Sequence, residues 1–156
     1  MTGDTGGVQS RPASGAAAPA GFELSTDPGR IQFDLVHAWL AGSYWAAGRT
    51  AETQARANAG SRVYGVYDGN GAQVAFARAV TDGATYAWLC DVVVTEHARG
   101  RGIGTWLVDR ACGELEADGV RRILLATRDA HQVYRQLGFS ELRHPETMME
   151  RDRRRR

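Results

Sequence analysis

Residues 92–108 combine an apolar run, a cluster of glycines and a helical apolar stripe in one continuous segment. The segment continues the almost wholly apolar residues 85–94, a pattern typical of a strand that is buried on both faces. From Ile103 onward apolar residues recur every four positions, which predicts a helix with one buried face. Three glycines within residues 100–104 lie between the two elements and allow a ligand to approach the backbone closely.

The start of this predicted helix is suited to bind an anion. The first N–H groups of a helix have no intrahelical partner, and the helix dipole places partial positive charge at the same end. Arg99 and Arg101 add two cations, and the planar guanidinium group matches the oxygens of a phosphate. We therefore expect a diphosphate ligand, held by the loop from Arg99 to Gly104.

Other phosphate-binding loops fit the segment less well. A Walker P-loop needs a lysine, and all 19 basic residues of this chain are arginine. A dinucleotide fingerprint needs a third glycine where this chain has Thr105, and it opens a series of βαβ units, whereas this loop follows some four predicted strands. A tight turn of glycines beside two solvated arginines is an alternative that the residues alone leave open.

The order of predicted elements indicates an α+β fold. Residues 1–21 predict a flexible arm, residues 22–150 a single domain, and residues 151–156 an Arg-rich solvated tail. Within the domain we expect strands at 22–25, 62–67, 72–80, 85–94, 122–126, from 139 on and at 148–149, and helices at 35–40 (capped by Asp34), 51–59 (capped by Thr50), 103–118 and 129–137. This is an antiparallel meander with one βαβ unit attached.

Bulk properties exclude several classes of partner. A net charge of +1 gives no general attraction to nucleic acid or to an anionic membrane, and we do not expect nucleic acid as a partner. No apolar run approaches the roughly 18 residues of a membrane span and no signal peptide is recognised, so we expect a cytoplasmic protein without a membrane partner. The two cysteines are expected as free thiols, and no Cys/His cluster has the spacing of a metal site, so no metal is expected.

Two motifs resemble those of the GNAT N-acetyltransferase superfamily. Arg99-x-x-Gly102-x-Gly104 after a hydrophobic strand is similar to the pyrophosphate-binding motif of that family. Downstream, residues 130–139 resemble its A-x-x-L-Y-x-x-x-G-F segment. The similarity covers most of residues 22–150 and implies a mixed, mostly antiparallel sheet of six to seven strands flanked by about four helices. It also implies acetyl-CoA as the acyl donor and a primary amine of a small molecule or peptide as the acceptor.

The resemblance implies cofactor-binding roles for a stretch of backbone. The pantetheine arm is expected to pair with the central strand, and the pyrophosphate to bind the N–H groups of the loop and the helix start. These residues are Val92, Val93, Val94, Arg99, Gly100, Arg101, Gly102, Ile103, Gly104 and Thr105. A further contact is expected at Thr127, where the second motif often begins with Asn. An N–H near Val92 is the expected oxyanion donor.

Two residues are candidates for the proton transfers. Tyr134 of the second motif is the candidate general acid, because a phenol with an ordinary pKa near 10 keeps a proton for the departing thiolate; the alternative is a ring that only packs on the core. Asp91 lies in the apolar run of the central strand, where burial is expected to raise the pKa of its carboxyl and make it a general base or an ammonium contact. The alternative for Asp91 is a structural acid held by arginine or by the backbone.

The acceptor is expected to contact the first two helices. Tyr44 and Trp45, at the end of the first predicted helix, are candidates for binding it, as is His131 of the second motif; packing of the two aromatic rings on the core is the simpler alternative. A non-catalytic acyl-CoA-binding sensor or partner domain is the second hypothesis for the whole chain, and the presence of Tyr134 favours the enzyme. The family resemblance leaves a homodimer open.

Overall fold

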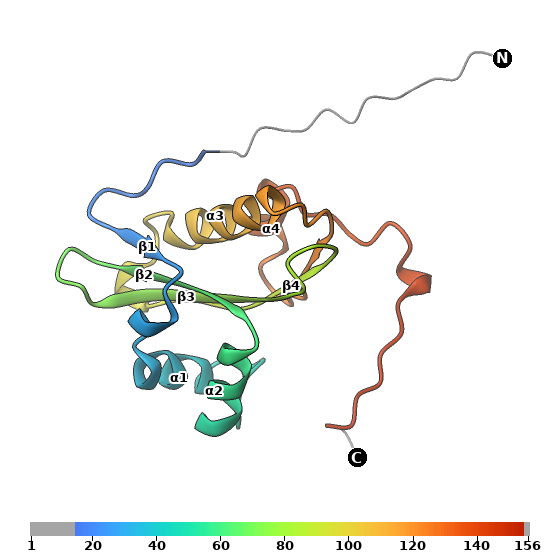
Figure 1. Cartoon of the computed structure of the whole chain (residues 1–156), viewed down its shortest axis with the longest axis horizontal. Helices are drawn as coiled ribbons and strands as arrows, with labels where there is room; N and C mark the ends of the chain where they lie inside the picture. The colour runs from blue at the N-terminus through green and yellow to red at the C-terminus, as the bar shows by residue number, and fades with distance from the viewer. Residues whose placement is uncertain (1–14, 155–156) are drawn as a thin grey trace, which may run out of the picture. The chain divides into compact units, whose positions relative to one another are not determined.

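The computed structural model describes residues 15–154 of the 156-residue chain (Figure 1). These residues group into two compact units, residues 15–126 and residues 127–154, and each is considered by itself. Most of the predicted arm and the last two residues of the predicted tail lie outside the described residues. The parts of the arm and tail that are described, 15–21 and 151–154, contain no helix or strand.

Residues 15–126 contain five strands and three α-helices. In chain order they are β1 (Glu23–Ser25), α1 (Phe33–Ala41), α2 (Ala51–Ala59), β2 (Arg62–Tyr67), β3 (Gln73–Thr81), β4 (Ala87–Val94), α3 (Ile103–Ala117) and β5 (Ile123–Leu124), with the 3₁₀ turns η1 (Pro28–Arg30) and η2 (Glu96–Ala98). The strands form one sheet in the order β1-β2-β3-β4-β5, antiparallel except for the parallel pair β4/β5. The predicted meander followed by one βαβ unit is confirmed.

The sheet has fewer strands than the predicted six to seven. The strand expected at 122–126 is reduced to Ile123–Leu124, and the strands expected from residue 139 on and at 148–149 do not form within the described residues. Residues 140–150 are exposed throughout. An extended segment that neither packs nor pairs gains too little to hold a strand conformation, because its backbone groups bond to water instead of to a ladder.

Local signals set most helix boundaries. Thr50 caps α2 as predicted, since its hydroxyl accepts a hydrogen bond from the N–H of Thr53 over 3.2 Å. The long helix α3 begins at Ile103 as predicted. The start of α1 differs, because Gln32 rather than Asp34 occupies the cap position and Asp34 lies in the first turn. A carboxylate in the first turn still interacts favourably with the helix dipole.

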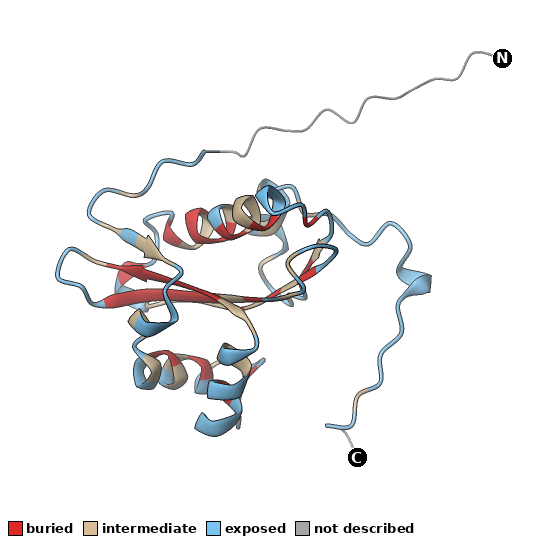
Figure 2. Ribbon diagram, in the orientation of Figure 1, coloured by how far each residue is buried: buried red, intermediate tan, exposed pale blue. Residues whose placement is uncertain are grey.

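The helices of residues 15–126 cover opposite faces of the sheet: α3 lies on one face, and α1 and α2 lie on the other (Figure 1). The most continuous burial follows β2 and β3 between these layers (Figure 2). Val36 and Leu40 of α1 pack with Val63 and Phe76 of the sheet. On the other face the apolar stripe of α3 is buried, which fixes the helix and the loop that leads into it.

Residues 127–154 contain one α-helix, α4 (His131–Gln136), and one 3₁₀ turn, η3 (Pro145–Thr147). The end of α4 is a Schellman motif, in which Gly138 has a φ of +89° and the N–H of Phe139 donates to the carbonyl of Tyr134 over 3.1 Å. The Tyr134 and Phe139 rings contact edge to face, with centroids 5.8 Å apart. The Y-x-x-x-G-F part of the second sequence motif is therefore a helix stop that also restrains the tyrosine ring.

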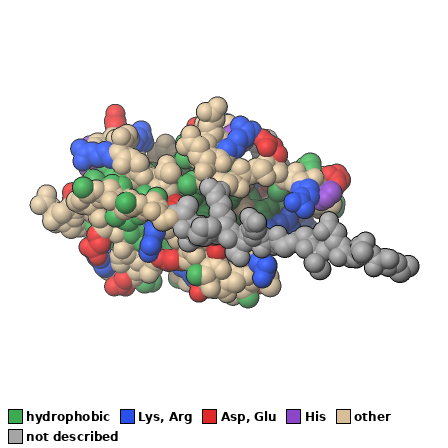
Figure 3. Space-filling view, turned by 90° about the horizontal axis from the view of Figure 1, so that it is seen from above, with side chains coloured by type: hydrophobic (Ala, Val, Ile, Leu, Met, Phe, Trp, Pro, Cys, Tyr) green, Lys and Arg blue, Asp and Glu red, His purple; other side chains and the backbone are tan. Residues whose placement is uncertain are grey.

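Surface charge is mixed in sign on the face that Figure 3 shows, where arginine and acidic side chains are interspersed. This distribution agrees with the small net charge of +1. None of the helices in residues 15–154 has both the length and the apolar composition needed to cross a membrane.

Candidate functional site

The glycine loop, residues 99–104, follows β4 and η2 and leads into α3. Gly100 and Gly102 have φ values of +74° and +75°, a conformation that other residues disfavour because of their Cβ atom. The hydrogen bond that opens α3 runs from the N–H of Trp106 to the carbonyl of Gly102, over 3.0 Å. The N–H groups of residues 103–105 therefore precede the hydrogen-bond ladder of the helix.

The glycine loop presents unpaired donors and two cations. None of the hydrogen bonds found among residues 15–154 uses the N–H groups of residues 100–105. Arg99 donates from Nε to the carbonyl of Val94 over 3.1 Å, and Cζ of Arg101 lies 5.9 Å from the centroid of the Phe22 ring. Both arginines are exposed. The loop thus combines free N–H groups with positive charge, which is the chemistry of an anion site.

Close packing joins this loop to the end of β4. A Cβ placed on Gly104 would lie 3.3 Å from Cγ2 of Val94, so glycine at this position lets the first turn of α3 approach the strand. Val92, Val93 and Val94 are half-buried on β4. The predicted pantetheine strand and the predicted pyrophosphate loop are therefore neighbours within residues 15–126.

A β-bulge lies at the start of this part of β4. In the pairing with β3, Phe76 lies opposite Val93 and Arg78 lies opposite Cys90. One residue of β3 therefore faces two of β4, and Asp91 is the first of the two. Asp91 has a φ of +55° and is the one non-glycine residue of 15–154 with a positive φ. Aspartate tolerates this conformation better than most residues, but surrounding contacts must hold it.

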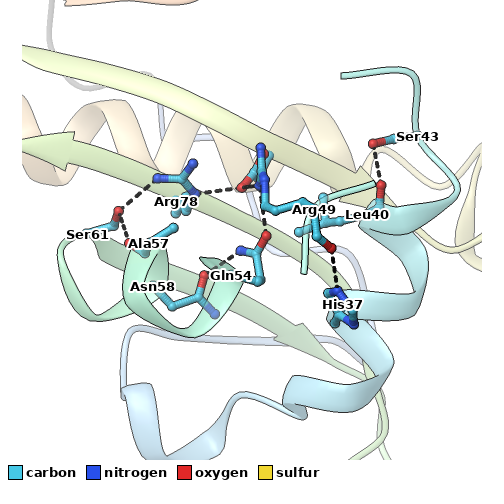
Figure 4. A network of polar contacts seen from close by, with 10 residues as sticks. His37, Leu40, Ser43, Arg49, Gln54, Ala57, Asn58, Ser61 and Arg78 are labelled. Atoms are coloured by element: carbon cyan, nitrogen blue, oxygen red, sulfur yellow. Dashed lines mark hydrogen bonds and ion pairs between the residues drawn. The ribbon is translucent and has the colours of Figure 1, made fainter. Parts of the chain in front are cut away.

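Two arginines supply those contacts (Figure 4). Arg49 donates from Nη1 and Arg78 donates from Nε to the same oxygen, Oδ2 of Asp91, each over 2.6 Å. The Asp91 side chain is 1% exposed, while those of Arg49 and Arg78 are 20% and 11% exposed. The other oxygen, Oδ1, is buried without a hydrogen-bond partner among the described residues. The carboxylate is thus a buried anchor for two segments of the chain.

The two arginines extend these contacts to α2. Arg78 donates from Nη1 to the hydroxyl of Ser61 over 3.1 Å, and Arg49 donates from Nη1 to Oε1 of Gln54 over 2.8 Å. Gln54 is buried and donates in turn to Oδ1 of Asn58 over 2.7 Å. We call this set the Asp91 network: Asp91, Arg49, Arg78, Ser61, Gln54 and Asn58. It ties α2 and the connection that precedes it to β3 and β4 (Figure 4).

The predicted rise in the pKa of Asp91 is wrong. Burial alone raises the pKa of its carboxyl, but hydrogen bonds from Arg78 and Arg49, together with their charges, hold that pKa below its ordinary value. Asp91 is therefore ionised at neutral pH and binds a proton too weakly to be an efficient general base there. Its contacts are those of the alternative interpretation, an acid held by arginine.

The lowered pKa of Asp91 predicts a specific loss of stability in acid. A carboxyl whose folded-state pKa lies below its unfolded value of about 3.8 stabilises the fold fully above that value, and this stabilisation is lost as the pH falls through the folded pKa. We expect the Tm difference between the wild type and Asp91→Asn to be constant near neutral pH and to shrink below about pH 4. Thermal melts of both proteins over this range measure it; a difference that grows toward acid contradicts the lowered pKa.

The predicted acceptor residues Tyr44 and Trp45 lie beyond the end of α1, in its connection to α2. Their exposed fractions are 45% and 40%, and their rings contact edge to face with centroids 5.0 Å apart. The alternative of ordinary core packing is therefore wrong. Both rings are presented at the surface by the same connection that carries Arg49.

Three further predicted site residues belong to residues 127–154. The hydroxyl of Thr127 accepts a hydrogen bond from the N–H of Ala130 over 3.1 Å, which closes the turn before α4. His131 is exposed at the first position of α4, and Tyr134 is half-buried with its ring against Phe139. The predicted site residues thus fall into two sets: these three in one unit, and Asp91, the β4 valines, the glycine loop and the aromatic pair in the other.

Sequence reasoning missed Arg49 and Arg78. Arg78 carried a signal, because it is the one charged residue within β3 and lies across the β3–β4 hairpin from the region of Asp91. No sequence signal marked Arg49, because its partner Asp91 is 42 residues away and the residues around Arg49 are those of an ordinary connection before a helix.

Comparison with known proteins identifies the family to which this geometry belongs. Residues 27–139 match the family model described as the acetyltransferase (GNAT) family. The chain belongs to the GNAT acetyltransferase family. The match extends from η1 through the Asp91 network and the glycine loop to the cap of α4, so it includes both motifs that carry the sequence resemblance. GNAT enzymes use acetyl-CoA as donor and amines as acceptors.

Three relatives illustrate the similarity to other GNAT proteins. A crystal structure of a protein named as a GNAT acetyltransferase from Xanthomonas campestris pv. campestris is 38% identical, with a TM-score of 0.78 and coverage of 84% of this chain and 92% of that one. A protein of Gibberella zeae named as an acetyltransferase is 28% identical over 143 residues, which are 78% of this chain and 81% of that protein. An acetyltransferase structure from Deinococcus radiodurans R1 shares the fold, with 22% identity, a TM-score of 0.65 and coverage of 88% and 92%.

The fold class is therefore the predicted α+β GNAT fold, confirmed by these neighbours. Within the described residues it has a mixed sheet of five strands and four α-helices. The helix count agrees with the prediction, and the strand count is below it.

Proposed function

We propose that this GNAT protein is an acetyl-CoA-dependent N-acetyltransferase that moves an acetyl group to a primary amine of a small molecule or peptide, by direct attack of the amine on the thioester. The glycine loop carries the proposal, because N–H groups without partners and two exposed arginines follow the half-buried end of β4. We propose that residues 22–150 form one acetyltransferase domain, in line with the family match over residues 27–139.

The residues of the glycine loop fit the diphosphate of acetyl-CoA. Gly100 and Gly102 have no Cβ, and no atom lies within 4 Å of where one would stand, so a ligand can meet the backbone there. In this proposal the loop and the helix start bind the pyrophosphate, the backbone of residues 92–94 pairs with the pantetheine arm, and Thr127 adds a contact. Acetyl-CoA, once bound, supplies the activated acetyl group as a thioester.

The bulge at Asp91 supports this placement of the donor. A bulge bends its strand and leaves one residue out of the ladder, and this one consists of Asp91 and Val92. We propose an N–H near Val92 as the donor that stabilises the oxyanion, since donors fixed in advance act most strongly on developing charge. Asp91 contributes here by holding the bulge through Arg49 and Arg78, and not by taking a proton from the amine.

Tyr134 is the proposed general acid. A phenol keeps its proton at neutral pH and can give it to the departing thiolate. The Schellman motif of α4 and the contact with Phe139 restrain the Tyr134 ring, and a proton donor acts best when it is held in one geometry. Tyr44, Trp45 and His131 are the proposed contacts of the acceptor, and the side chains of all three are exposed.

The test is a titration with acetyl-CoA by calorimetry, together with a thiol-release assay on a panel of amines. Binding, with CoA release that depends on an added amine, supports the enzyme. The chain contains no lysine, so acetylation of its own side-chain amines does not contribute to the background. Binding without release from any amine supports instead a non-catalytic acyl-CoA-binding module, and a lack of binding removes the basis of the proposal.

Replacing Gly102 with valine is expected to weaken acetyl-CoA binding by about tenfold or more. Valine disfavours a φ of +75°, so the backbone leaves the conformation that presents the N–H groups of the loop. The Kd of acetyl-CoA, measured by calorimetry on the wild type and the variant, checks this expectation.

Gly69→Val is the matched control for that substitution. Gly69 is also exposed with no atom within 4 Å of an added Cβ, but it lies in the β2–β3 turn and its φ is not in the left-handed region. Its Kd is expected to equal that of the wild type. Equal losses of affinity in the two variants would contradict a specific role of the glycine loop.

A further inference from the structure

The Asp91 network carries one more positive charge than negative. The guanidinium groups of Arg49 and Arg78 share one carboxylate, and no other acidic side chain of residues 15–154 forms an ion pair with either. Both arginines are largely buried, with 20% and 11% of their side chains exposed. A cation that is removed from water without a full counter-charge is unfavourable, so this network is suited to take up an anion.

Arg49 has the donors for such an anion. Both of its hydrogen bonds, to Asp91 and to Gln54, come from Nη1, and its Nε and Nη2 groups donate to no residue in the described part of the chain. A guanidinium with two free neighbouring nitrogens can bind a carboxylate or a phosphate through two parallel N–H bonds. Arg78 is the less exposed of the pair and uses two of its nitrogens, on Asp91 and Ser61.

The surroundings of Arg49 connect it to both proposed substrate sites. Tyr44 and Trp45, the proposed acceptor contacts, lie on the same connection between α1 and α2. Asp91, which Arg49 contacts over 2.6 Å, directly precedes Val92 at the start of the proposed donor strand. Arg49 therefore links the acceptor elements to the donor strand within residues 15–126.

We propose that the acceptor of this enzyme is an amine that also carries an anionic group, a carboxylate or a phosphate, and that Arg49 binds this group. The inference rests on the proposed function. The anion supplies the counter-charge that the Asp91 network lacks, and its binding orients the amine at the other end of the molecule. Amino acids and phosphorylated amines are two sources of this chemistry, and amines without negative charge lack it.

The test compares matched acceptors in the thiol-release assay with acetyl-CoA. The pairs are glycine with glycinamide, phenylalanine with phenylalaninamide, and phosphoethanolamine with ethanolamine; each pair keeps the amine and removes the anion. Values of kcat/KM are expressed per concentration of neutral amine, because the two members of a pair differ in amine pKa. We expect the kcat/KM of the wild type to be higher for the anionic member by on the order of tenfold or more. This is the effect expected from hydrogen bonds to a charged group.

In Arg49→Gln this preference is expected to fall to about one, through a higher KM for the anionic acceptor. Loss of the Arg49–Asp91 contact also disturbs the bulge, but that effect acts equally on both members of a pair, so the ratio of their kcat/KM values is the readout. Arg56→Gln is the matched control, since Arg56 is exposed on α2 and lies outside the Asp91 network. Should Arg49→Gln fail to fold, Arg49→Lys keeps the charge without the planar fork and is expected to keep only part of the preference.

The outcomes separate this inference from the proposed function. A wild type that acetylates neutral amines equally well, or a folded Arg49→Gln variant that keeps the preference, overturns the inference and leaves the N-acetyltransferase standing. If no amine causes CoA release from protein that binds acetyl-CoA, the proposed function is overturned and the inference with it. A preference confined to the carboxylate pairs or to the phosphate pair supports the inference and identifies the source of the anion.

Discussion

Replacing Asp91 with alanine is expected to lower the Tm by on the order of 10 °C. The substitution leaves the guanidinium groups of Arg49 and Arg78 without the carboxylate that both contact over 2.6 Å. Removal of one partner from a buried ion pair destabilises a protein by roughly 3–5 kcal/mol, because the remaining charge stays buried without compensation. Thermal melts of the variant and the wild type at neutral pH measure the shift.

Asp118→Ala is the matched control for burial. Asp118 contacts Arg62 over the same 2.6 Å, but the two side chains are 49% and 31% exposed. An exposed pair contributes about 0–1 kcal/mol, so the Tm is expected to fall by a few degrees at most. Equal Tm losses in the two variants would show that the burial of Asp91 is not what makes its ion pairs important.

Two further substitutions separate the charge of Asp91 from its backbone conformation. Asp91→Asn removes the charge and keeps a side chain that tolerates the φ of +55°. Asp91→Gly removes the charge and also relieves the conformational strain. Because the charge is expected to dominate, both variants should lose most of the stability that Asp91→Ala loses. A glycine variant as stable as the wild type would assign the importance of this position to the backbone instead.

Replacing Tyr134 with phenylalanine is expected to lower kcat by about 10²- to 10⁴-fold and to leave the Kd of acetyl-CoA unchanged. Phenylalanine keeps the edge-to-face contact with Phe139 and the backbone bonds of the α4 cap, so the phenolic proton donor is the group that is lost. Turnover in the thiol-release assay and calorimetric Kd values, measured on the same preparations, separate the two effects.

Tyr86→Phe is the control for that experiment. Tyr86 is 37% exposed beside the β3–β4 turn and has no role in the proposed mechanism, so loss of its hydroxyl is expected to leave turnover unchanged. Normal turnover in Tyr134→Phe would remove Tyr134 as the general acid. A loss of kcat that comes with weaker acetyl-CoA binding would show instead that the hydroxyl serves the structure of the site.

Features that depend on neighbouring residues were predictable from the sequence. The β-branched and aromatic run at 62–67 forms β2 with those bounds, and the hydroxyl of Thr50 caps α2. The glycine loop could be recognised for the same reason, since its strand, glycines and helix are contiguous in the chain. Periodicity, composition and bonds between a side chain and nearby backbone are all local, and the family resemblance rests on such local motifs.

Features that depend on distant residues were not predictable. The pKa of Asp91 is lowered by two arginines, and Arg49 is separated from it by 42 residues and a sheet register that no local pattern shows. The strands predicted from residue 139 on and at 148–149 were wrong for a related reason. Residues 140–150 stay exposed, and a strand requires a partner as well as suitable residues. The exposure of Tyr44 and Trp45 likewise depends on where α1 ends.

Gly138, in the cap of α4, is a further position at which a mutation is expected to inactivate the enzyme. Gly138 has no contact with donor or acceptor in the proposed function, yet its φ of +89° turns the chain so that Phe139 returns to Tyr134. Any other residue disfavours that turn. A survey of gene variants that scores only the positions around the substrates would therefore miss Gly138, a position on which the proposed proton donor depends.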